Sequence, residues 1–515
     1  METHNRLEGT HLAYRLAEQV NRAAEREAIV HGERRMPYGE LWHEAQKVAA
    51  WLTSIGLQRG DRVALLMDNS PDYAAAYYGV LLAGGAVVAL NTAVKAPEIV
   101  NWLQHSEASA LIADARHSEL PAVLEGMPDR LVVLALGDSR KPLPGPVASW
   151  NALPAANDFV PVTTRDSDLG AIIYTSGTTG APKGVMLSQG NLAANLDSIL
   201  AYLRLTKADS IVNVLPFYYS YGNSVLHTHL AVGGRIILEN SLMYPHRVVE
   251  RIVNEKATGF SGVPSTFALL LSRVALQQYD LTSLRYVTQA GGAMPPAHTR
   301  RLREILGNTD IVIMYGQTEA TARIAWLPPD RIDDKPGSCG KAIPGVEVEI
   351  RDENDQPVPP GTLGEICVRG ANIMQGYWRN PEATAKVVVN GWLHTGDLAR
   401  MDEEGFLFIE GRRSDMIKAG ANRISPQEIE EVIQELDAVA EAGVVGVPDE
   451  ILGEAIKAVI VPREGAHLDK RTILSHCRKR LALYKIPKFV EFAEALPKTA
   501  SGKIRRYLLN EAKAG

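Results

Sequence analysis

Short apolar runs alternate with amphipathic stretches through much of the chain, and this alternation limits the folds that it can adopt. Apolar side chains from Leu41 to Ile55 recur at spacings of three and four, which predicts a helix with one buried face. Apolar runs short enough to be buried strands each end in a turn or a glycine-containing segment: RVALLM at 62–67, IVNVLP at 211–216, RIILEN at 235–240 and IVIMYG at 311–316. Helices that alternate with buried strands are typical of α/β layers, so we predict mostly parallel sheets.

The chain changes in character twice toward its C-terminus. After about Pro336 the strands become shorter and are separated by Gly and Pro turns, which predicts a small antiparallel barrel or sheet. Beyond GRRSD at 411–415, strands and helices alternate as in a small α+β domain. A chain of 515 residues is expected to fold into two or more domains. We predict an α/β protein with a large N-terminal domain of layered sheets and a small β-barrel-like part (1–411), a hinge near 412–414, and a small α+β C-terminal domain (415–515).

Composition and charge argue against several classes of protein. A formal net charge of −6 gives no sign of the basic surface that nucleic-acid binding needs. The cysteines are far apart, so we expect reduced core thiols at Cys339, Cys367 and Cys477. The polar N-terminal segment does not resemble a signal peptide, from which we expect a cytoplasmic protein. The uncharged run at 73–90 contains Gly84-Gly85, which predicts a buried helix, turn and strand and not a membrane span.

The segment YTSGTTGAPKGV at 174–185 combines the residue types that bind phosphate. Its glycines let backbone N–H groups turn toward one point, its hydroxyl groups add donors, and Lys183 adds a positive charge. It is not a Walker A loop, because Pro182 precedes the lysine and Gly184 follows it. Taken alone, the segment is equally compatible with a solvated hairpin turn.

Further motifs follow along the chain. They are GGAMPP at 291–296, YGQTEAT at 315–321, HTGD at 394–397, GRRSDMIK at 411–418, ISPQEIE at 424–430 and PKTASGKIRR at 497–506. Together with YTSGTTGAPKGV they resemble, in order, the motifs of the adenylate-forming superfamily, which includes acyl-CoA synthetases, aryl-acid ligases, nonribosomal adenylation domains and firefly luciferase. The resemblance spans nearly the whole chain. It implies that a carboxylate attacks the α-phosphate of ATP to give an acyl-adenylate and pyrophosphate, and that a thiol then displaces AMP.

The resemblance also implies roles for individual residues. The ATP phosphates are expected to contact Thr175, Ser176, Gly177, Thr178, Thr179, Gly180, Lys183 and Thr318. Adenine and ribose are expected at Gly291, Gly292, Ala293, Tyr315, Gly316, Asp397 and Arg412. Within that set Tyr315 is expected to stack on the base, and the carboxylate of Asp397 to accept both ribose hydroxyls. Glu319 is the expected Mg²⁺ ligand, and Lys503 is the expected catalytic lysine that bridges the incoming carboxylate and the α-phosphate.

In the resembling family the C-terminal domain is mobile and rotates between the two half-reactions. Ser414 occupies the hinge position, where relatives commonly have Asp or Lys. The rotation is expected to withdraw Lys503 and to present a thiol channel formed by Lys418, Gly420 and Ala421. Relatives usually have glycine at position 421, and here Gly420 stands one position earlier. This shift leaves open whether the acceptor is CoA or the phosphopantetheine arm of an acyl or peptidyl carrier protein.

The acyl pocket is expected to be lined by Tyr218, Tyr219, Tyr221, Ser265, Gly292 and Thr321. No Asp or Glu lies between Ile211 and Leu238, so a buried substrate ammonium would lack a partner, and a neutral fatty or aryl acid is favoured. The tyrosines are equally compatible with pocket walls and with plain packing. We predict a cytoplasmic acid–CoA ligase, with a homodimer as one compatible assembly. The alternatives are a ligase that loads a carrier protein, a nucleotide-binding regulator without catalysis, and a luciferase-like oxygenase.

Overall fold

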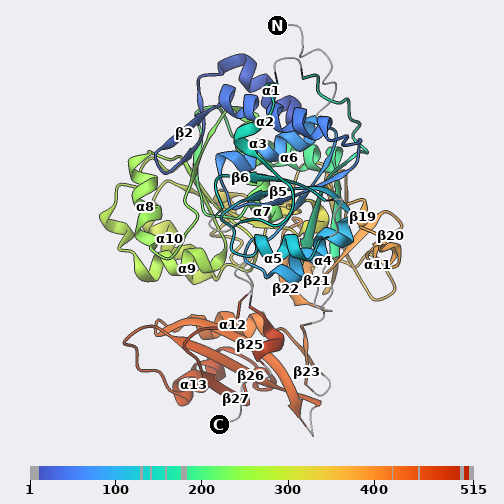
Figure 1. Ribbon diagram of the computed structural model, residues 1–515. Coiled ribbons are helices and arrows are strands. Elements are labelled where there is room, and N and C mark those ends of the chain that lie inside the picture. The colour runs from blue at the N-terminus through green and yellow to red at the C-terminus, as the bar shows by residue number, and fades with distance from the viewer. Residues whose placement is uncertain are drawn as a thin grey trace.

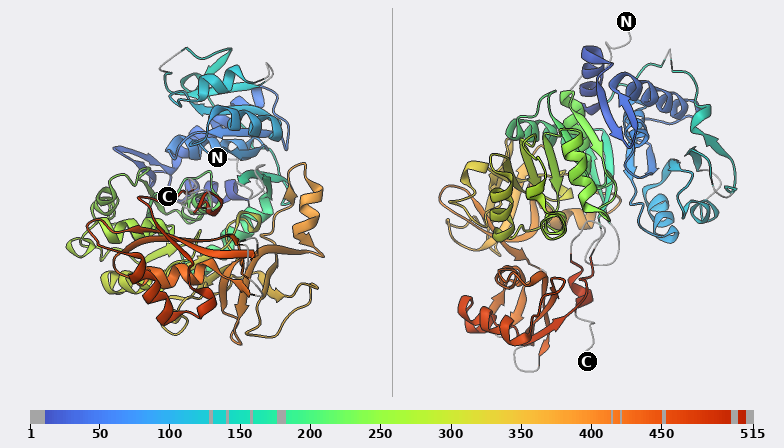
Figure 2. Two further views of the ribbon diagram at one scale, coloured as in Figure 1. Left: turned by 90° about the horizontal axis from the view of Figure 1, so that it is seen from below. Right: turned by 90° about the vertical axis from the view of Figure 1, so that its left-hand side faces the viewer.

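The chain forms two lobes of unequal size. The computed structural model describes residues 11–127, 131–139, 142–156, 159–175, 183–413, 415–419, 422–449, 453–498 and 504–509. A large N-terminal lobe lies above a smaller C-terminal lobe (Figure 1). After a rotation of 90° about the vertical axis, the C-terminal lobe is again separate from the rest of the chain (Figure 2, right).

The first sheet of the large lobe contains nine strands among the described residues, in the order β16-β15-β14-β13-β12-β10-β11-β1-β2. Their bounds are β1 (Glu27–His31), β2 (Arg34–Pro37), β10 (Ser210–Asn213), β11 (Arg235–Leu238), β12 (Gly259–Gly262), β13 (Tyr286–Gln289), β14 (Asp310–Tyr315), β15 (Ala325–Leu327) and β16 (Lys341–Ala342). Neighbours from β14 to β1 run parallel, and β2, β15 and β16 are antiparallel to their neighbours. The strands predicted at 211–216, 235–240 and 311–316 correspond to β10, β11 and β14, so the predicted parallel arrangement is confirmed.

The second sheet contains eight strands in the described part of the chain, in the order β19-β9-β8-β4-β3-β5-β6-β7. Their bounds are β3 (Arg62–Leu66), β4 (Ala86–Ala89), β5 (Ala108–Asp114), β6 (Val132–Leu136), β7 (Val147–Ser149), β8 (Leu169–Thr175), β9 (Lys183–Ser188) and β19 (Gly376–Tyr377). The strands from β8 to β7 run parallel, whereas β9 and β19 are antiparallel to their neighbours.

Helices cover both sheets of the large lobe. Their bounds are α1 (Leu12–Ala23), α2 (Tyr38–Ser54), α3 (Pro71–Leu82), α4 (Ala96–Ser106), α5 (Leu120–Glu125), α6 (Gln189–Leu203), α7 (Ser220–Val232), α8 (Pro245–Asn254), α9 (Pro264–Arg273), α10 (Pro296–Leu306) and α11 (Pro381–Val387). The main apolar core joins α1, α2, α3, α6 and α7 to one face of each sheet. Helices α8 to α10 cover the other face of the first sheet, and α4 and α5 cover the other face of the second. The predicted α/β layers are therefore present.

Local sequence explains where several of these elements begin and end. The predicted helix at 41–55 lies within α2, and the uncharged run at 73–90 divides into α3 and β4 around Gly84, whose φ is 77°. Ser70 caps α3 by accepting a hydrogen bond from the backbone of Tyr73. Ser188 and Asn191 form a capping box at the start of α6. Of the helices in the described residues, none combines the length and apolar character that crossing a membrane requires.

The predicted antiparallel region forms a third sheet of five strands among the described residues. Their bounds are β17 (Val346–Arg351), β18 (Gly364–Gly370), β20 (Val388–Val389), β21 (Trp392–Met401) and β22 (Leu407–Arg412). Every pair in this sheet is antiparallel. The change to antiparallel pairing already begins in the first sheet, at β15 and β16.

The C-terminal lobe has its own apolar cores. Its elements are β23 (Ile417–Ala419), β24 (Asn422–Ile424), α12 (Pro426–Gln434), β25 (Val439–Asp449), β26 (Gly453–Pro462), α13 (Lys470–Arg480), β27 (Phe489–Phe492) and α14 (Arg506–Leu509). Helices α12 and α13 pack on one face of the sheet, and Leu496 and Leu509 pack on the other. Ser425 donates a hydrogen bond to the Glu410 carbonyl oxygen and so ties α12 to β22. The exact domain bounds stay predictions, since residue 414 lies outside the described residues.

Candidate active site

The glycine-rich segment joins two antiparallel strands. β8 ends at Thr175 and β9 begins at Lys183, and these two residues pair across the hairpin. The expected phosphate contacts between them stay predictions, because the described residues do not include Ser176, Gly177, Thr178, Thr179 and Gly180. A Walker A loop leads from a strand into a helix, whereas this segment leads from one strand into another. The topology therefore agrees with the exclusion of a Walker A loop.

Lys183, Tyr377 and Glu319 come together beside this hairpin. The short strand β19 pairs with β9 and places Tyr377 opposite Val185. The Lys183 ammonium lies 4.9 Å from the centroid of the Tyr377 ring. The Tyr377 hydroxyl donates to Glu319 Oε1 at 2.9 Å, and burial together with the charge of Glu319 raises the pKa of Tyr377, so the phenol remains a donor. The expected phosphate-binding lysine and the expected metal ligand thus share one aromatic neighbour.

Tyr315, Asp397 and Arg412 form a second group, carried by β14, β21 and β22. The Tyr315 hydroxyl donates to Asp397 Oδ2 at 2.6 Å, and Arg412 Nε donates to Asp397 Oδ1 at 3.0 Å. The pairing of Asp397 with Arg412 across β21 and β22 fixes this geometry. Burial and the neighbouring Asp397 raise the pKa of Tyr315 well above its ordinary value. The expected adenine and ribose residues therefore do meet in space.

Arg412 connects the two groups electrostatically. Its pKa is raised first by Asp397 and then by Tyr315 and Glu319, while burial opposes the rise. The charges of both carboxylates, Asp397 and Glu319, therefore act on the same guanidinium. Thr318 adds a contact to α7, because its Oγ1 lies 3.3 Å from Ser220 Oγ.

Glycines let the backbone approach closely at this edge of the first sheet. A Cβ at Gly316 would lie 2.0 Å from the Ala322 carbonyl oxygen, so only glycine fits there. Gly291 has a φ of 89°, in the region that favours glycine. Gly292 and Ala293 are exposed, and the Gly292 carbonyl oxygen accepts from Gln289 Nε2 at 2.8 Å. This backbone edge follows β13, the strand beside β14, and the adenine and acyl contacts expected there stay predictions.

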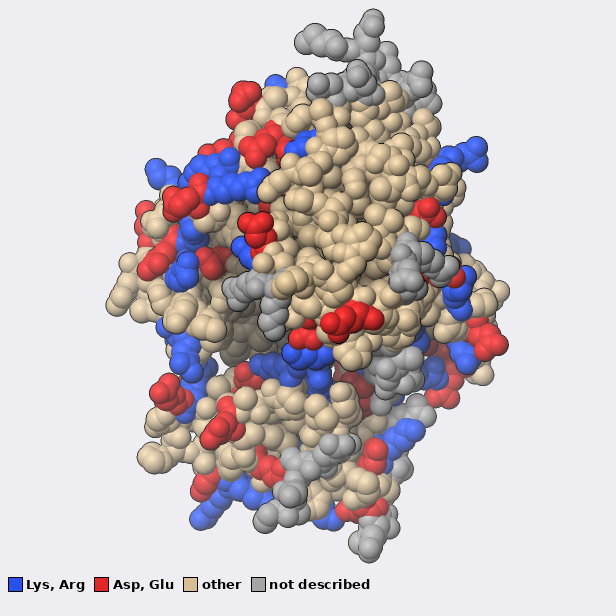
Figure 3. Space-filling view, viewed as in Figure 1, with Lys and Arg blue, Asp and Glu red and all other residues tan. Residues whose placement is uncertain are grey.

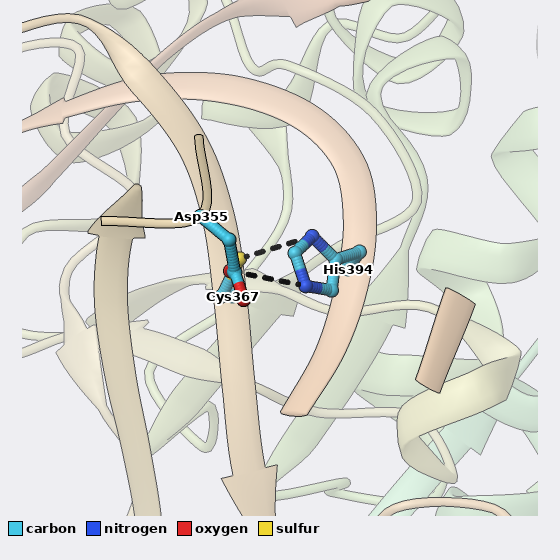
Figure 4. Close-up of side chains that lie close together, drawn as sticks. All are labelled: Asp355, Cys367 and His394. Atoms are coloured by element: carbon cyan, nitrogen blue, oxygen red, sulfur yellow. Dashed lines mark hydrogen bonds and ion pairs between the residues drawn. The ribbon is translucent and has the colours of Figure 1, made fainter. Parts of the chain in front are cut away.

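A partly buried cluster stabilises the strand that carries Asp397. Glu365 Oε1 accepts from the backbone N–H of Gly396 at 2.8 Å. His394 Nδ1 lies 3.5 Å from Cys367 Sγ, and its Nε2 lies 3.4 Å from Asp355 Oδ1 (Figure 4). These contacts join β18 and the turn that holds Asp355 to β21.

The same cluster has to be tested as a metal site. Asp355, Cys367 and His394 each offer one ligand atom, and these atoms lie within 4.8 Å of one another. However, Arg351 already donates to Asp355 Oδ1 at 2.9 Å. Burial raises the pKa of Cys367 to about 12, so the thiol is protonated at neutral pH. With its carboxylate paired and its thiol protonated, the cluster is better suited to holding β21 than to binding a metal.

The tyrosines expected at the acyl pocket have protein partners. The Tyr221 hydroxyl lies 2.8 Å from Thr288 Oγ1, and the Arg323 guanidinium lies 4.2 Å from the centroid of the Tyr221 ring. The rings of Tyr218 and Tyr219 meet edge to face at 4.8 Å. These contacts support a packing role for the tyrosines. Tyr219 is only half-buried, so it could also contact a ligand. The assignment of the tyrosines to the pocket therefore stays a prediction. Ser265 is half-buried in the first turn of α9, which leaves its assignment a prediction as well.

The expected residues of the C-terminal lobe are described only in part. Lys418 is exposed on β23, and its backbone N–H donates to Glu454 Oε2 at 2.6 Å. The expected catalytic lysine, hinge and thiol-channel residues otherwise lie outside the described residues: Lys503, Ser414, Gly420 and Ala421. Their roles stay predictions.

Sequence reasoning did not identify three residues of this region. Tyr377 contacts both Lys183 and Glu319. The local sequence gave only the pair Gly376-Tyr377 as a sign that this position has a role. Arg323 is buried four residues after Glu319 and two residues before β15 begins. Glu365 holds the backbone of HTGD from a neighbouring strand. Each was missed because its partner lies far away in the sequence.

A hollow lies between the two lobes in the space-filling view, and both basic and acidic side chains lie along it (Figure 3).

Comparisons with known proteins agree with this geometry. A family model described as AMP-binding enzyme matches residues 16–378, and one described as AMP-binding enzyme C-terminal domain matches residues 428–503. The long-chain-fatty-acid–CoA ligase of Bacillus subtilis (strain 168) is 34% identical, over 96% of this chain and 93% of its own. A feruloyl-CoA synthase of Amycolatopsis sp is 36% identical, over 93% of this chain and 94% of its own.

A solved structure resembles the whole chain in the same way. The crystal structure of an anthranilate CoA ligase in complex with anthranoyl-AMP has a TM-score of 0.90 and 29% sequence identity, and covers 98% of this chain and 97% of that one. The family models, the relatives and the shared fold agree with the sequence motifs to which the residues of the two groups belong. The chain therefore belongs to the AMP-binding enzyme family, within the adenylate-forming superfamily, and is an AMP-forming acid–thiol ligase.

Proposed function

We propose that the protein activates a carboxylic acid with ATP and transfers the acyl group to the thiol of CoA. The observation that carries this proposal is the convergence of Lys183, Glu319, Asp397 and Arg412, with Tyr377 and Tyr315 between them. A carboxylate that can accept hydrogen bonds from ribose, a carboxylate that can bind a metal ion and two cations are groups that suit the binding of ATP. The relatives named as CoA ligases support the choice of acceptor.

The first half-reaction brings two anions together. A carboxylate oxygen of the acid attacks the α-phosphorus of ATP, the bond from that phosphorus to the bridging oxygen breaks, and pyrophosphate leaves with the electron pair. The chain has to position these groups and neutralise their charge, because little proton transfer is involved. Lys183 would contact the outer phosphates, Asp397 would hold the ribose, and Lys503 would bridge the carboxylate and the α-phosphate.

The second half-reaction forms the thioester. The sulfur of CoA attacks the acyl carbon, the bond from that carbon to the AMP oxygen breaks, and AMP leaves while the thiol proton passes to solvent. Rotation about the predicted hinge at 412–414 would first withdraw Lys503. The segment from Lys418 to Ala421 would then line the thiol channel.

The residues present fit a magnesium ion at Glu319. Carboxylate oxygens are ligands that Mg²⁺ prefers, and the Tyr377 hydroxyl orients this carboxylate through Oε1. When bound there, Mg²⁺ would neutralise charge on the ATP phosphates. A fatty or aryl acid without an ammonium group is favoured, because α7 contains no Asp or Glu that could pair with one.

The test is acid-dependent exchange of labelled pyrophosphate into ATP, with a panel of fatty and aryl acids. At least one acid should support exchange, and addition of CoA should then yield AMP and an acyl-CoA. Exchange followed by acyl transfer only to a phosphopantetheinylated carrier protein would replace CoA with that acceptor. Absence of exchange with every acid would refute the proposal.

A further inference from the structure

The turn that carries Glu319 ends in a residue with a strained backbone. A short 3₁₀ helix, η3 (Thr318–Ala320), is followed by Thr321, whose φ is 63°. A side chain that is branched at Cβ rarely adopts this left-handed conformation, because Cβ then crowds the backbone. Such a conformation persists only where the surrounding structure fixes it, and it is most common at functional sites. The contacts that fix Thr321 therefore bear on the site at Glu319.

Asn372 fixes this turn from the loop between β18 and β19. Its Nδ2 donates to the Arg323 carbonyl oxygen at 2.9 Å and to the Ala320 carbonyl oxygen at 3.1 Å. Two carbonyl acceptors require the NH₂ group of the amide at this place, which defines the orientation of the side chain. The backbone carbonyl oxygen of Asn372 accepts from Thr321 Oγ1 at 2.5 Å. One buried residue, only 1% exposed, thus contacts the turn before, at and after the strained position.

The two donors distinguish Asn372 from a residue that only fills space. Its Oδ1 is buried and has no hydrogen-bond partner in the described part of the chain. An apolar side chain would fill a similar volume without leaving a buried oxygen unpaired. A Cβ at Gly370 would lie 2.7 Å from that oxygen, so the neighbouring backbone leaves room for the amide. The gain from asparagine at this position therefore comes from its hydrogen bonds to the turn.

The same loop connects the turn to the phosphate hairpin. The backbone N–H of Met374 donates to the Glu319 carbonyl oxygen at 2.9 Å. The next backbone N–H, that of Gln375, donates to the Met186 carbonyl oxygen of β9 at 2.9 Å. The loop that begins with Asn372 therefore joins the backbone of the expected metal ligand to the strand that begins at Lys183.

We propose that Asn372 is a positioning residue for the metal site, and that it holds the turn at 318–323 in the conformation that places the Glu319 carboxylate beside Tyr377. The inference rests on the proposed function, in which Glu319 binds Mg²⁺, and adds a residue from outside the motif YGQTEAT. Tyr377 orients the carboxylate, while Asn372 holds the backbone from which it extends. Without the two donors Thr321 would relax toward a negative φ. Metal binding would then have to order the turn, which lowers the affinity.

The direct measurement is the contribution of the metal to nucleotide binding. Calorimetry gives the affinity of the full-length enzyme for α,β-methylene-ATP with Mg²⁺ and with EDTA, and the ratio of the two reports what Mg²⁺ adds. Asn372→Leu removes both donors with little change in side-chain volume. It should lower this ratio about tenfold, as is typical of residues that orient a metal ligand, and leave the affinity in EDTA at the wild-type value. Thr321→Val removes one hydrogen bond and should lower the ratio by a smaller factor.

The two half-reactions give the second readout, with an acid that supports pyrophosphate exchange in the wild type. Asn372→Leu should need about tenfold more Mg²⁺ for half-maximal pyrophosphate release. It should form thioester from the supplied acyl-adenylate and CoA at the wild-type rate, because that step does not involve the ATP phosphates. Thr309→Val is the matched control for Thr321→Val. The Thr309 hydroxyl also donates to carbonyl oxygens, but those of Leu284 and Leu306, so this variant should keep both readouts unchanged.

The outcomes separate this inference from the proposed function. A wild-type ratio near one, or the same ratio in the wild type, Asn372→Leu and Thr321→Val, would overturn the inference and leave the ligase activity intact. Equal loss of both half-reactions in Asn372→Leu would also overturn it, because the role would then be structural only. If Asn372→Leu fails to fold, Thr321→Val gives the answer. Absence of exchange with every acid would refute the proposed function, and the calorimetric ratios would still test the positioning of the metal site.

Discussion

The group formed by Tyr315, Asp397 and Arg412 leads to a prediction about ATP binding. In Asp397→Asn one carboxylate oxygen becomes an NH₂ group, while Tyr315 and Arg412 still present donors to both positions. The side chain also loses the charge that would strengthen its hydrogen bonds to the two ribose hydroxyls. We therefore expect weaker binding of ATP without loss of the chemistry at the α-phosphate.

The expected size follows from exposure and hydrogen bonding. The Arg412 side chain is 44% exposed, so the ion pair itself contributes at most about 1 kcal/mol. Hydrogen bonds to a charged acceptor contribute roughly 1 kcal/mol more than neutral ones, which gives about 2 kcal/mol for two ribose hydroxyls. That difference corresponds to roughly a 30-fold loss in kcat/KM for ATP, carried mainly by KM.

The assay is pyrophosphate release at varied ATP or 2′-deoxy-ATP, for the wild type and the variant. Removing the 2′-hydroxyl should lower kcat/KM clearly more in the wild type than in Asp397→Asn, because the variant has already weakened the contact that the hydroxyl makes. Asp402→Asn is the matched control, since Asp402 lies in the same sheet region but pairs with Lys335 outside the site. If removal of the 2′-hydroxyl lowers kcat/KM by the same factor in the wild type and in Asp397→Asn, Asp397 does not hold the ribose and the reasoning is wrong.

Three further predictions concern catalysis, magnesium and pH. Lys503→Ala should reduce acyl-adenylate formation at least about 100-fold yet largely spare thioester formation from a supplied acyl-adenylate, and equal loss of both steps would contradict its role. Tyr377→Phe removes the 2.9 Å hydrogen bond to Glu319, so about tenfold more Mg²⁺ should be needed for half-maximal activity, and an unchanged magnesium titration would argue against that site. Burial lowers the pKa of His229 to about 4 from an unfolded value of 6.5, so the neutral imidazole contributes stability above pH 6.5 that is lost as the pH falls toward 4. By pH 5 the loss is about 2 kcal/mol, and urea unfolding of His229→Gln should show a smaller drop between pH 7 and pH 5; equal drops in both proteins would refute the assignment.

The local pattern of the chain was enough to predict much of the fold. The spacing of apolar residues predicted α2, β3, β10, β11 and β14, because this spacing reflects which face of an element is buried. The glycine pair at 84–85 correctly divided the longest uncharged run. The short strands β19 and β20 were not predicted, because a strand of two residues is too short to show a periodic pattern. Such strands form only because neighbouring strands already lie beside them.

The sequence by itself determined the family and predicted the reacting groups, because both depend on motifs of neighbouring residues. Only the tertiary structure decided that Tyr377 joins Lys183 to Glu319, and that Tyr315 and Arg412 meet at Asp397. Such meetings depend on the register of strands and the packing of helices, which act over distances that no local pattern records. For that reason the motifs were enough to indicate the general chemistry, whereas the contacts that hold the site residues in place were decided by folding.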